Sequence, residues 1–158
     1  MTDWPEVTLG NVQRMHVLAS TIPHAQLAEA VVDVPFDRVW RWFSDLETSI
    51  PAFDGQVRRL DVRERSGTRQ QVTARQGPFS CVPLRFDVLL EPDGWCLMTG
   101  AARLYVVGMC AEPAGPDRCR VALLEAVPRR IGRLADRFLA HHVAGDVRRM
   151  KRLLENAT

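Results

Sequence analysis

Residues 129–155 read RRIGRLADRFLAHHVAGDVRRMKRLLE, and this segment decides which fold the chain can adopt. Its apolar residues recur at intervals of three and four, which predicts one amphipathic helix over Arg129–Glu155. At about 1.5 Å per residue, a helix of about 25 residues is roughly 38 Å long. A helix of this length at the end of a small chain needs a broad apolar surface, so we expect the preceding residues to form a curved sheet that packs against it.

Two polar residues interrupt the apolar face of this helix. His142 and Asp146 fall on the same arc as Leu139 and are four residues apart, so their side chains can meet. Gly145 lies beside them, although glycine inside a helix costs about 1 kcal/mol relative to alanine. A polar pair beside a gap on an apolar face marks this position as a candidate site.

The composition indicates one ordinary globular domain. The chain has 158 residues, with 46% apolar and 25% charged residues and a net charge of +2. We expect no nucleic-acid partner, no membrane span and, because the N-terminus has no signal-peptide pattern, a cytoplasmic protein. The cysteines Cys81, Cys96, Cys110 and Cys119 lack ligand spacing, so we expect free thiols and no structural zinc.

Alternating apolar and polar residues predict about seven strands. We expect residues 1–24 to form an N-terminal extension, in which 12–18 could pack on the body, and residues 25–158 to form one domain. A first strand over 26–34 is followed by two short helices, over 36–43 and 47–52. The remaining strands are expected at 57–62, 68–75, 84–91, 95–99, 103–111 and 118–126.

The last two strands form a hairpin across residues 113–117, and its register decides where Glu125 points. Pairing Glu112 with Cys119 sets Val106 opposite Glu125 and turns both toward the apolar face, near the long helix. A shift of one residue would reverse the orientation.

Several phrases of the sequence resemble the START-like proteins, also called SRPBCC or helix-grip proteins. Ala30-Val31-Val32-Asp33-Val34-Pro35-Phe36-Asp37-Arg38-Val39-Trp40 resembles their opening strand and helix, and Glu91-Pro92 before Trp95 resembles a turn between their middle strands. The end, Val147–Glu155, is similar to the closing helix of the polyketide cyclase/dehydrase branch. The resemblance spans about residues 26–155 and implies an α+β helix-grip fold.

This resemblance implies a cavity between the sheet and the last helix that binds a hydrophobic small molecule. We expect a cofactor-independent cyclase or dehydratase of natural-product biosynthesis, as a monomer or homodimer. The alternatives are a non-catalytic carrier of a lipid, quinone or sterol, and an interaction protein whose cavity has closed. The sequence contains no GxSxG, HExxH, P-loop or GxGxxG motif, so no nucleotide, flavin or metal is implied.

The candidate catalytic residues are His142, Asp146 and Glu125. A histidine oriented by a carboxylate could act as a general base, could hydrogen-bond a ligand, or could simply pair with Asp146. Glu125 could be a buried acid with a raised pKa or could pair with Arg129. The candidate ligand contacts are Trp40, Phe43, Arg58, Phe86, Val106, Phe138 and Leu139; the alternative for the aromatic residues is a place in the core, and for Arg58 a solvated position on its strand.

Overall fold

The computed structural model describes residues 8–77, 83–100, 105–127 and 133–157. It confirms the expected α+β class, with a seven-stranded antiparallel sheet and a long C-terminal helix. In chain order the elements are α1 (Asn11–Thr21), β1 (Gln26–Val32), α2 (Phe36–Ser44), α3 (Leu46–Phe53), β2 (Val57–Ser66), β3 (Arg69–Gln76), β4 (Leu84–Glu91), β5 (Trp95–Gly100), β6 (Val106–Pro113), β7 (Cys119–Ala126) and α4 (Arg133–Asn156).

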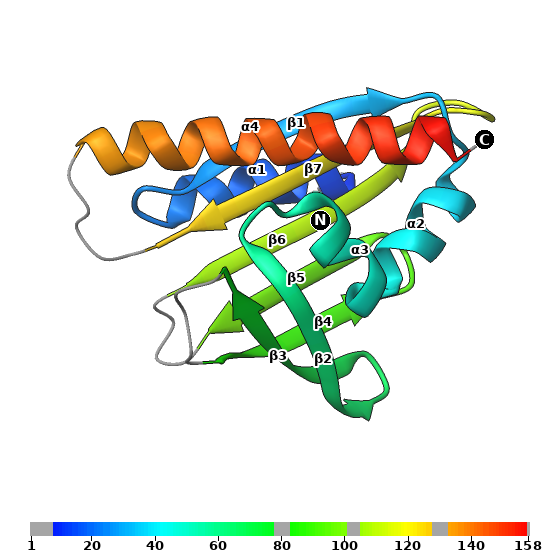
Figure 1. Cartoon of the computed structure of the whole chain (residues 1–158). Helices are drawn as coiled ribbons and strands as arrows, with labels where there is room; N and C mark the ends of the chain where they lie inside the picture. The colour runs from blue at the N-terminus through cyan, green and yellow to red at the C-terminus, as the bar shows by residue number, and fades with distance from the viewer. Residues whose placement is uncertain (1–7, 78–82, 101–104, 128–132, 158) are drawn as a thin grey trace, which may run out of the picture.

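The sheet has the strand order β1-β7-β6-β5-β4-β3-β2, with every neighbouring pair antiparallel. The first strand therefore closes onto the last one, while the six later strands form a meander. Figure 1 shows the sheet bending so that β2 and β3 lie across its lower part, with α4 along its upper edge. Register shifts in β2, after Val57 and after Val62, accompany this bend, since bulges increase local twist.

Helix α4 packs its apolar stripe against β1, β7 and α3. Val143, Val147 and Met150 are buried there, at the helical spacing expected of one face. Together with α2, α3 and the concave face of the sheet they enclose the main core, in which Phe43, Met109 and Leu123 are fully buried. The helix that organised the sequence-based prediction therefore covers the concave side of the sheet, as expected.

Helix α1 packs on the opposite face of the sheet and forms a second core there. Val12 and Met15 contact a set of sheet residues that alternate with those of the main core: Trp95, Val106, Cys110, Ala122, Leu124 and Ala126. Gly108 allows this approach, because a Cβ atom at this position would lie 2.7 Å from Met15 Sδ. The N-terminal segment thus covers the sheet, whereas the expected division at residue 24 stays a prediction.

The predicted register of the β6–β7 hairpin is wrong by one residue. Cys119 pairs with Pro113, and consequently Val107 rather than Val106 lies opposite Glu125. Because side chains alternate along a strand, the shift turns Val106 toward α1. Glu125 lies on the concave face with Leu123, as predicted. The prediction named the wrong set of alternating residues on β6 for this face, but the correct set on β7.

Smaller differences concern element ends and thiols. The first strand ends at Val32 instead of Val34, and the described part of the last helix begins at Arg133. Cys96, Cys110 and Cys119 are free and buried, while Cys81 lies outside the described residues. Within the described ranges, α4 and the other helices are too short or too polar to cross a membrane.

Candidate functional site

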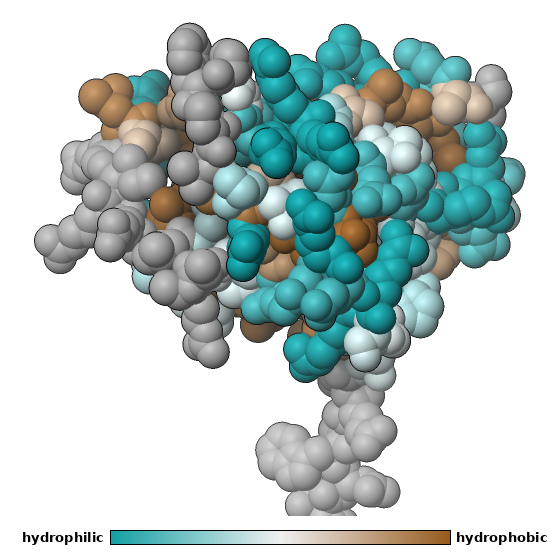
Figure 2. Space-filling view, turned by 60° about the horizontal axis from the view of Figure 1, so that its bottom comes forward, coloured by the Kyte–Doolittle hydropathy of each residue, from teal (hydrophilic) through white to brown (hydrophobic). Residues whose placement is uncertain are grey.

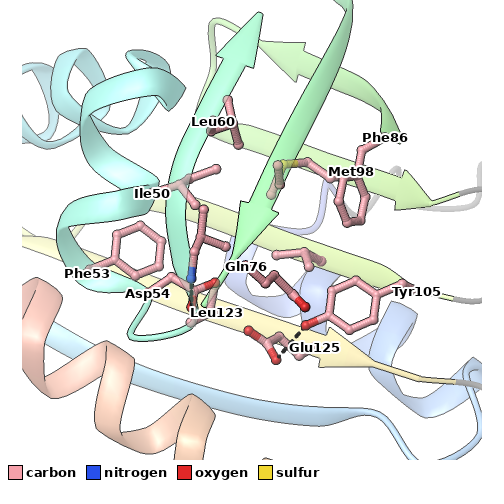
Figure 3. A pocket seen from close by; sticks show the side chains of 13 residues that line it. Ile50, Phe53, Asp54, Leu60, Gln76, Phe86, Met98, Tyr105, Leu123 and Glu125 are labelled. Atoms are coloured by element: carbon pink, nitrogen blue, oxygen red, sulfur yellow. Dashed lines mark hydrogen bonds between the residues drawn. The ribbon is translucent and has the colours of Figure 1, made fainter. Parts of the chain in front are cut away.

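The interior between the sheet and the helices contains a small enclosed cavity. Apolar side chains form most of its wall, including Ile50, Phe53, Leu60, Phe86, Met98 and Leu123. Figure 3 shows Asp54, Gln76, Tyr105 and Glu125 at the polar end of this space. The remaining volume is about 20 Å³, which is room for roughly one water molecule. The interior is therefore nearly filled, in contrast to the deep cavity expected from the resemblance.

At the polar end, four ionisable side chains from three elements converge. Nε2 of His142 lies 3.2 Å from Oδ2 of Asp146, 3.7 Å from Oε1 of Glu125 and 3.9 Å from Oδ1 of Asp54. Helix α4 supplies the histidine and one aspartate, β7 supplies the glutamate, and Asp54 follows the last residue of α3. We call Asp54, Glu125, His142 and Asp146 the acidic cluster.

Local hydrogen bonds fix the carboxylates of the acidic cluster. Oδ1 of Asp54 accepts the backbone N–H groups of Gln56 at 2.7 Å and of Val57 at 3.2 Å, which holds the turn between α3 and β2. The Tyr105 hydroxyl donates to Oε2 of Glu125 at 3.3 Å (Figure 3), while Oε1 of Glu125 lies 3.7 Å from Nε2 of His142. Asp146 accepts a hydrogen bond from the backbone N–H of Gly55.

Burial makes the carboxyl groups of Glu125 and Asp146 hard to ionise. The pKa of Glu125 is raised to about 8, chiefly by burial and then by the negative charges of Asp54 and Asp146, while the Tyr105 hydrogen bond opposes the rise. Burial also raises the pKa of Asp146 to about 6, against the lowering effects of His142, the Gly55 N–H and Arg149. The pKa of Tyr105 is raised as well, by burial first and by Glu125 next.

The acidic cluster separates the enclosed cavity from a groove on the surface. Asp54 and Glu125 line the cavity, whereas His142 and Asp146 line the groove, together with Gly55, His141, Gly145, Arg148, Arg149 and other residues of α4. A Cβ atom on Gly145 would meet only Arg148, at 3.9 Å, so this part of the groove stays open. The cluster can thus be reached from the α4 side without crossing the apolar core.

Four of the candidate ligand contacts lie in or beside the main core. Phe86 lines the cavity, and Trp40 and Phe43 are buried on α2 without lining it. Leu139 is half-buried and packs against the same core. Their role as ligand contacts stays a prediction.

The other three candidate contacts lie outside the main core, and their role as ligand contacts stays a prediction. Val106 faces α1, for the reason of register given above. Arg58 is exposed on the outer side of β2. Phe138 is 65% exposed because it and Leu134 share a side of α4 that turns away from the sheet. Arg129, considered as a partner of Glu125, lies outside the described residues.

Sequence reasoning did not identify Asp54 or Tyr105. Asp54-Gly55 reads as a turn, and it does form one, but nothing local shows that the turn abuts α4, far along the chain. Tyr105 is the only tyrosine of the chain. Its contact with Glu125 depends on the pairing of β6 with β7, which the sequence-based prediction placed one residue out of register.

This arrangement of a curved antiparallel sheet, two helices after its first strand and a C-terminal helix on its concave face is the helix-grip fold of START-like proteins. Known structures share it. The chain is similar to TTHA0849 from Thermus thermophilus, with a TM-score of 0.66 and 18% identity over 85% of this chain and 99% of that one.

Two enzymes of known structure are also similar to this chain, again at low sequence identity. The Zhui aromatase/cyclase from Streptomyces sp. R1128 has a TM-score of 0.63 and 14% identity, covering 84% of this chain and 93% of the other. Norcoclaurine synthase from Thalictrum flavum, in complex with dopamine and hydroxybenzaldehyde, has a TM-score of 0.57 and 14% identity, covering 100% and 99%. No family model and no curated protein matches the sequence. At these identities the comparisons establish the fold alone.

Proposed function

We propose that this protein binds a hydrophobic small molecule between the sheet and α4 and catalyses a cyclase- or dehydratase-type reaction on it. One observation carries the proposal: a histidine and three carboxyl groups converge at one end of an otherwise apolar interior. Similarity of fold to an aromatase/cyclase is consistent with this reaction class but does not establish it.

The chemistry requires that one proton be removed from carbon and that another be delivered to a departing or reacting oxygen. His142 is the candidate base, and Asp146, 3.2 Å away, would orient it. Glu125, held by Tyr105 at the cavity end, is the candidate acid. A substrate with an apolar body would lie along Phe86, Met98 and Leu123, with its oxygen-bearing end at the acidic cluster.

The small free volume places a condition on this function. Any ligand larger than a water molecule must push apart side chains that now fill the interior. Figure 2 shows a face whose middle is covered mostly by hydrophilic side chains, with hydrophobic atoms visible between them and in patches toward its upper edge. The small free volume of the cavity also favours a second candidate function, that of an interaction protein whose cavity has closed.

The test combines binding with turnover. The protein is titrated with 2-naphthol and with a linear poly-β-ketone thioester mimic while amide shifts of cavity residues are followed by NMR, and cyclised or dehydrated product is measured by chromatography. His142→Ala is expected to leave affinity within a few-fold and to lower turnover by about two orders of magnitude or more. Binding without turnover in the wild type would instead identify a carrier. If neither compound bound, the result would favour the second candidate function, an interaction protein with a closed cavity.

A further inference from the structure

The acidic cluster combines the ligand types of a metal centre. Each of Asp54, Glu125, His142 and Asp146 offers one ligand atom, and the four atoms lie within 4.8 Å of one another. One imidazole nitrogen and three carboxylate oxygens are ligands that first-row divalent cations accept. Within the described part of the chain, His142 is the only ion-pair partner of the three carboxyl groups.

A second observation points to a ligand and does not depend on composition. Nε2 of His142 and Oδ2 of Asp146 are buried atoms without a hydrogen-bond partner among the described residues, although only 3.2 Å separates them. The side chain of Asp146 is only 4% exposed. Leaving buried polar atoms unpaired costs free energy, and native proteins rarely do so without a reason such as a bound ion. Nε2 is therefore surrounded by three carboxylates and bonded to none.

The spacing of these atoms suits a small cation. With bonds of about 2.1 Å to nitrogen and oxygen, two ligands of one ion stand at most about 4.2 Å apart. All three distances from Nε2 to the carboxylate oxygens, 3.2, 3.7 and 3.9 Å, already lie below that limit. The four ligand atoms all lie within 4.8 Å of one another, so any separation above about 4.2 Å has to shorten by no more than a few tenths of an ångström for each side chain.

We propose that the acidic cluster binds one divalent transition-metal ion, of the Zn²⁺ or Mn²⁺ type, through Nε2 of His142 and one carboxylate oxygen each of Asp54, Glu125 and Asp146. Imidazole among the ligands favours these ions over Mg²⁺ and Ca²⁺. This metal site goes beyond the proposed function: with the ion bound, Nε2 of His142 and the carboxylate of Glu125 would be ligands instead of a free base and acid, and the ion would supply a Lewis acid at the polar end of the cavity. It also departs from the sequence-based expectation that no metal is implied.

The groups around the acidic cluster match those that support metal ligands elsewhere. The backbone N–H groups of Gln56 and Val57 orient Asp54, that of Gly55 orients Asp146, and Tyr105 orients Glu125. The surface groove offers an ion a route to His142 and Asp146. The positive charge of Arg149 also acts on Asp146 and lowers its pKa, and it reduces the affinity of the acidic cluster for a cation without occupying a ligand position.

The experiment is calorimetric titration of the full chain, purified without a histidine tag and stripped with EDTA, with Zn²⁺ and separately with Mn²⁺. We expect one ion per chain and a raised melting temperature. His142→Ala and the nearly isosteric Asp146→Asn should each weaken binding by more than about tenfold. Circular dichroism of each variant verifies that it is folded.

The matched control is His141→Ala, which removes the neighbouring, exposed histidine on the same helix. His16→Ala and His24→Ala test the exposed pairs that these residues form with Glu29 and Asp136. All three should bind Zn²⁺ as the wild type does. The proposal is overturned if the wild type binds neither ion, if folded Asp146→Asn binds as tightly as the wild type, or if a control variant loses the ion instead. Binding of 2-naphthol in EDTA is measured in parallel, so that failure of the metal site and failure of the proposed function give different results.

Discussion

Nε2 of His142 and Oδ2 of Asp146 lie 3.2 Å apart, one turn along the same helix, without forming a hydrogen bond. The spacing of four residues brings the two side chains together, as the sequence predicts. Two groups from other elements lie near the same nitrogen, Glu125 on β7 and Asp54 after the end of α3. His142 and Asp146, which the sequence predicts as an isolated pair, are thus two of the four residues of the acidic cluster.

Replacing Glu125 should change how stability depends on pH. In EDTA, the folded state keeps this carboxyl protonated up to a pKa of about 8, whereas the ordinary pKa of the group is 4.5. Between these two values the folded state binds the extra proton, so stability falls as pH rises, by up to about 1.4 kcal/mol per pH unit. Glu125→Gln removes this contribution, and urea unfolding at several pH values measures it. Equal slopes for the wild type and the variant above pH 5 would show that Glu125 ionises freely in the folded protein.

The core should tolerate loss of one phenylalanine of α4 but not of one on α2. Phe43 is fully buried, and Phe43→Ala is expected to lower the free energy of unfolding by about 3–5 kcal/mol. Phe138 is 65% exposed, and Phe138→Ala should change it by no more than about 0.5 kcal/mol. Urea denaturation of both variants makes the comparison. A large loss from Phe138→Ala would place that ring in the core after all.

Helix α1 should contribute to the stability of the whole domain. Met15 is completely buried between α1 and the sheet, so Met15→Ala is expected to cost about 2–5 kcal/mol. Val17 is on the exposed side of the same helix, and Val17→Ala should be nearly neutral, within about 0.5 kcal/mol. Thermal unfolding of both variants tests this. If neither substitution shifted the melting temperature, residues 1–24 would be an extension that the domain does not need.

The sequence predicted those features that depend on local periodicity. The apolar stripe of α4 follows from residues three and four apart, and the strands follow from alternation, so the order of elements from β1 to α4 could be predicted. The face on which Val106 lies could not, because both alternating sets of β6 are apolar and each is buried, one by α1 and the other by the main core. Alternation that buries both faces gives no preference between registers.

The composition of the site was predictable only in part. His142 and Asp146 are polar residues on an apolar helical face, which is a local signal. Asp54 reaches them through tertiary packing of α3 against α4, and no pattern around Asp54 distinguishes it from an ordinary turn residue. Phe138 was predicted to face the interior but is exposed. An apolar residue in an amphipathic helix is expected inside, and only the position of the sheet shows that this one is not.

The burial of the central strands on both faces has a mechanical consequence. β6 and β7 are held between α1 on one side and the core beneath α4 on the other, so they should be the last part of the chain to exchange amide hydrogens. Strand β2 is exposed along most of its length and has one unpaired edge. Glu125 therefore lies on a strand that is held on both faces, whereas Asp54 lies just before the exposed edge strand β2. If the interior widens by movement of β2, the distance between these two carboxylates will change.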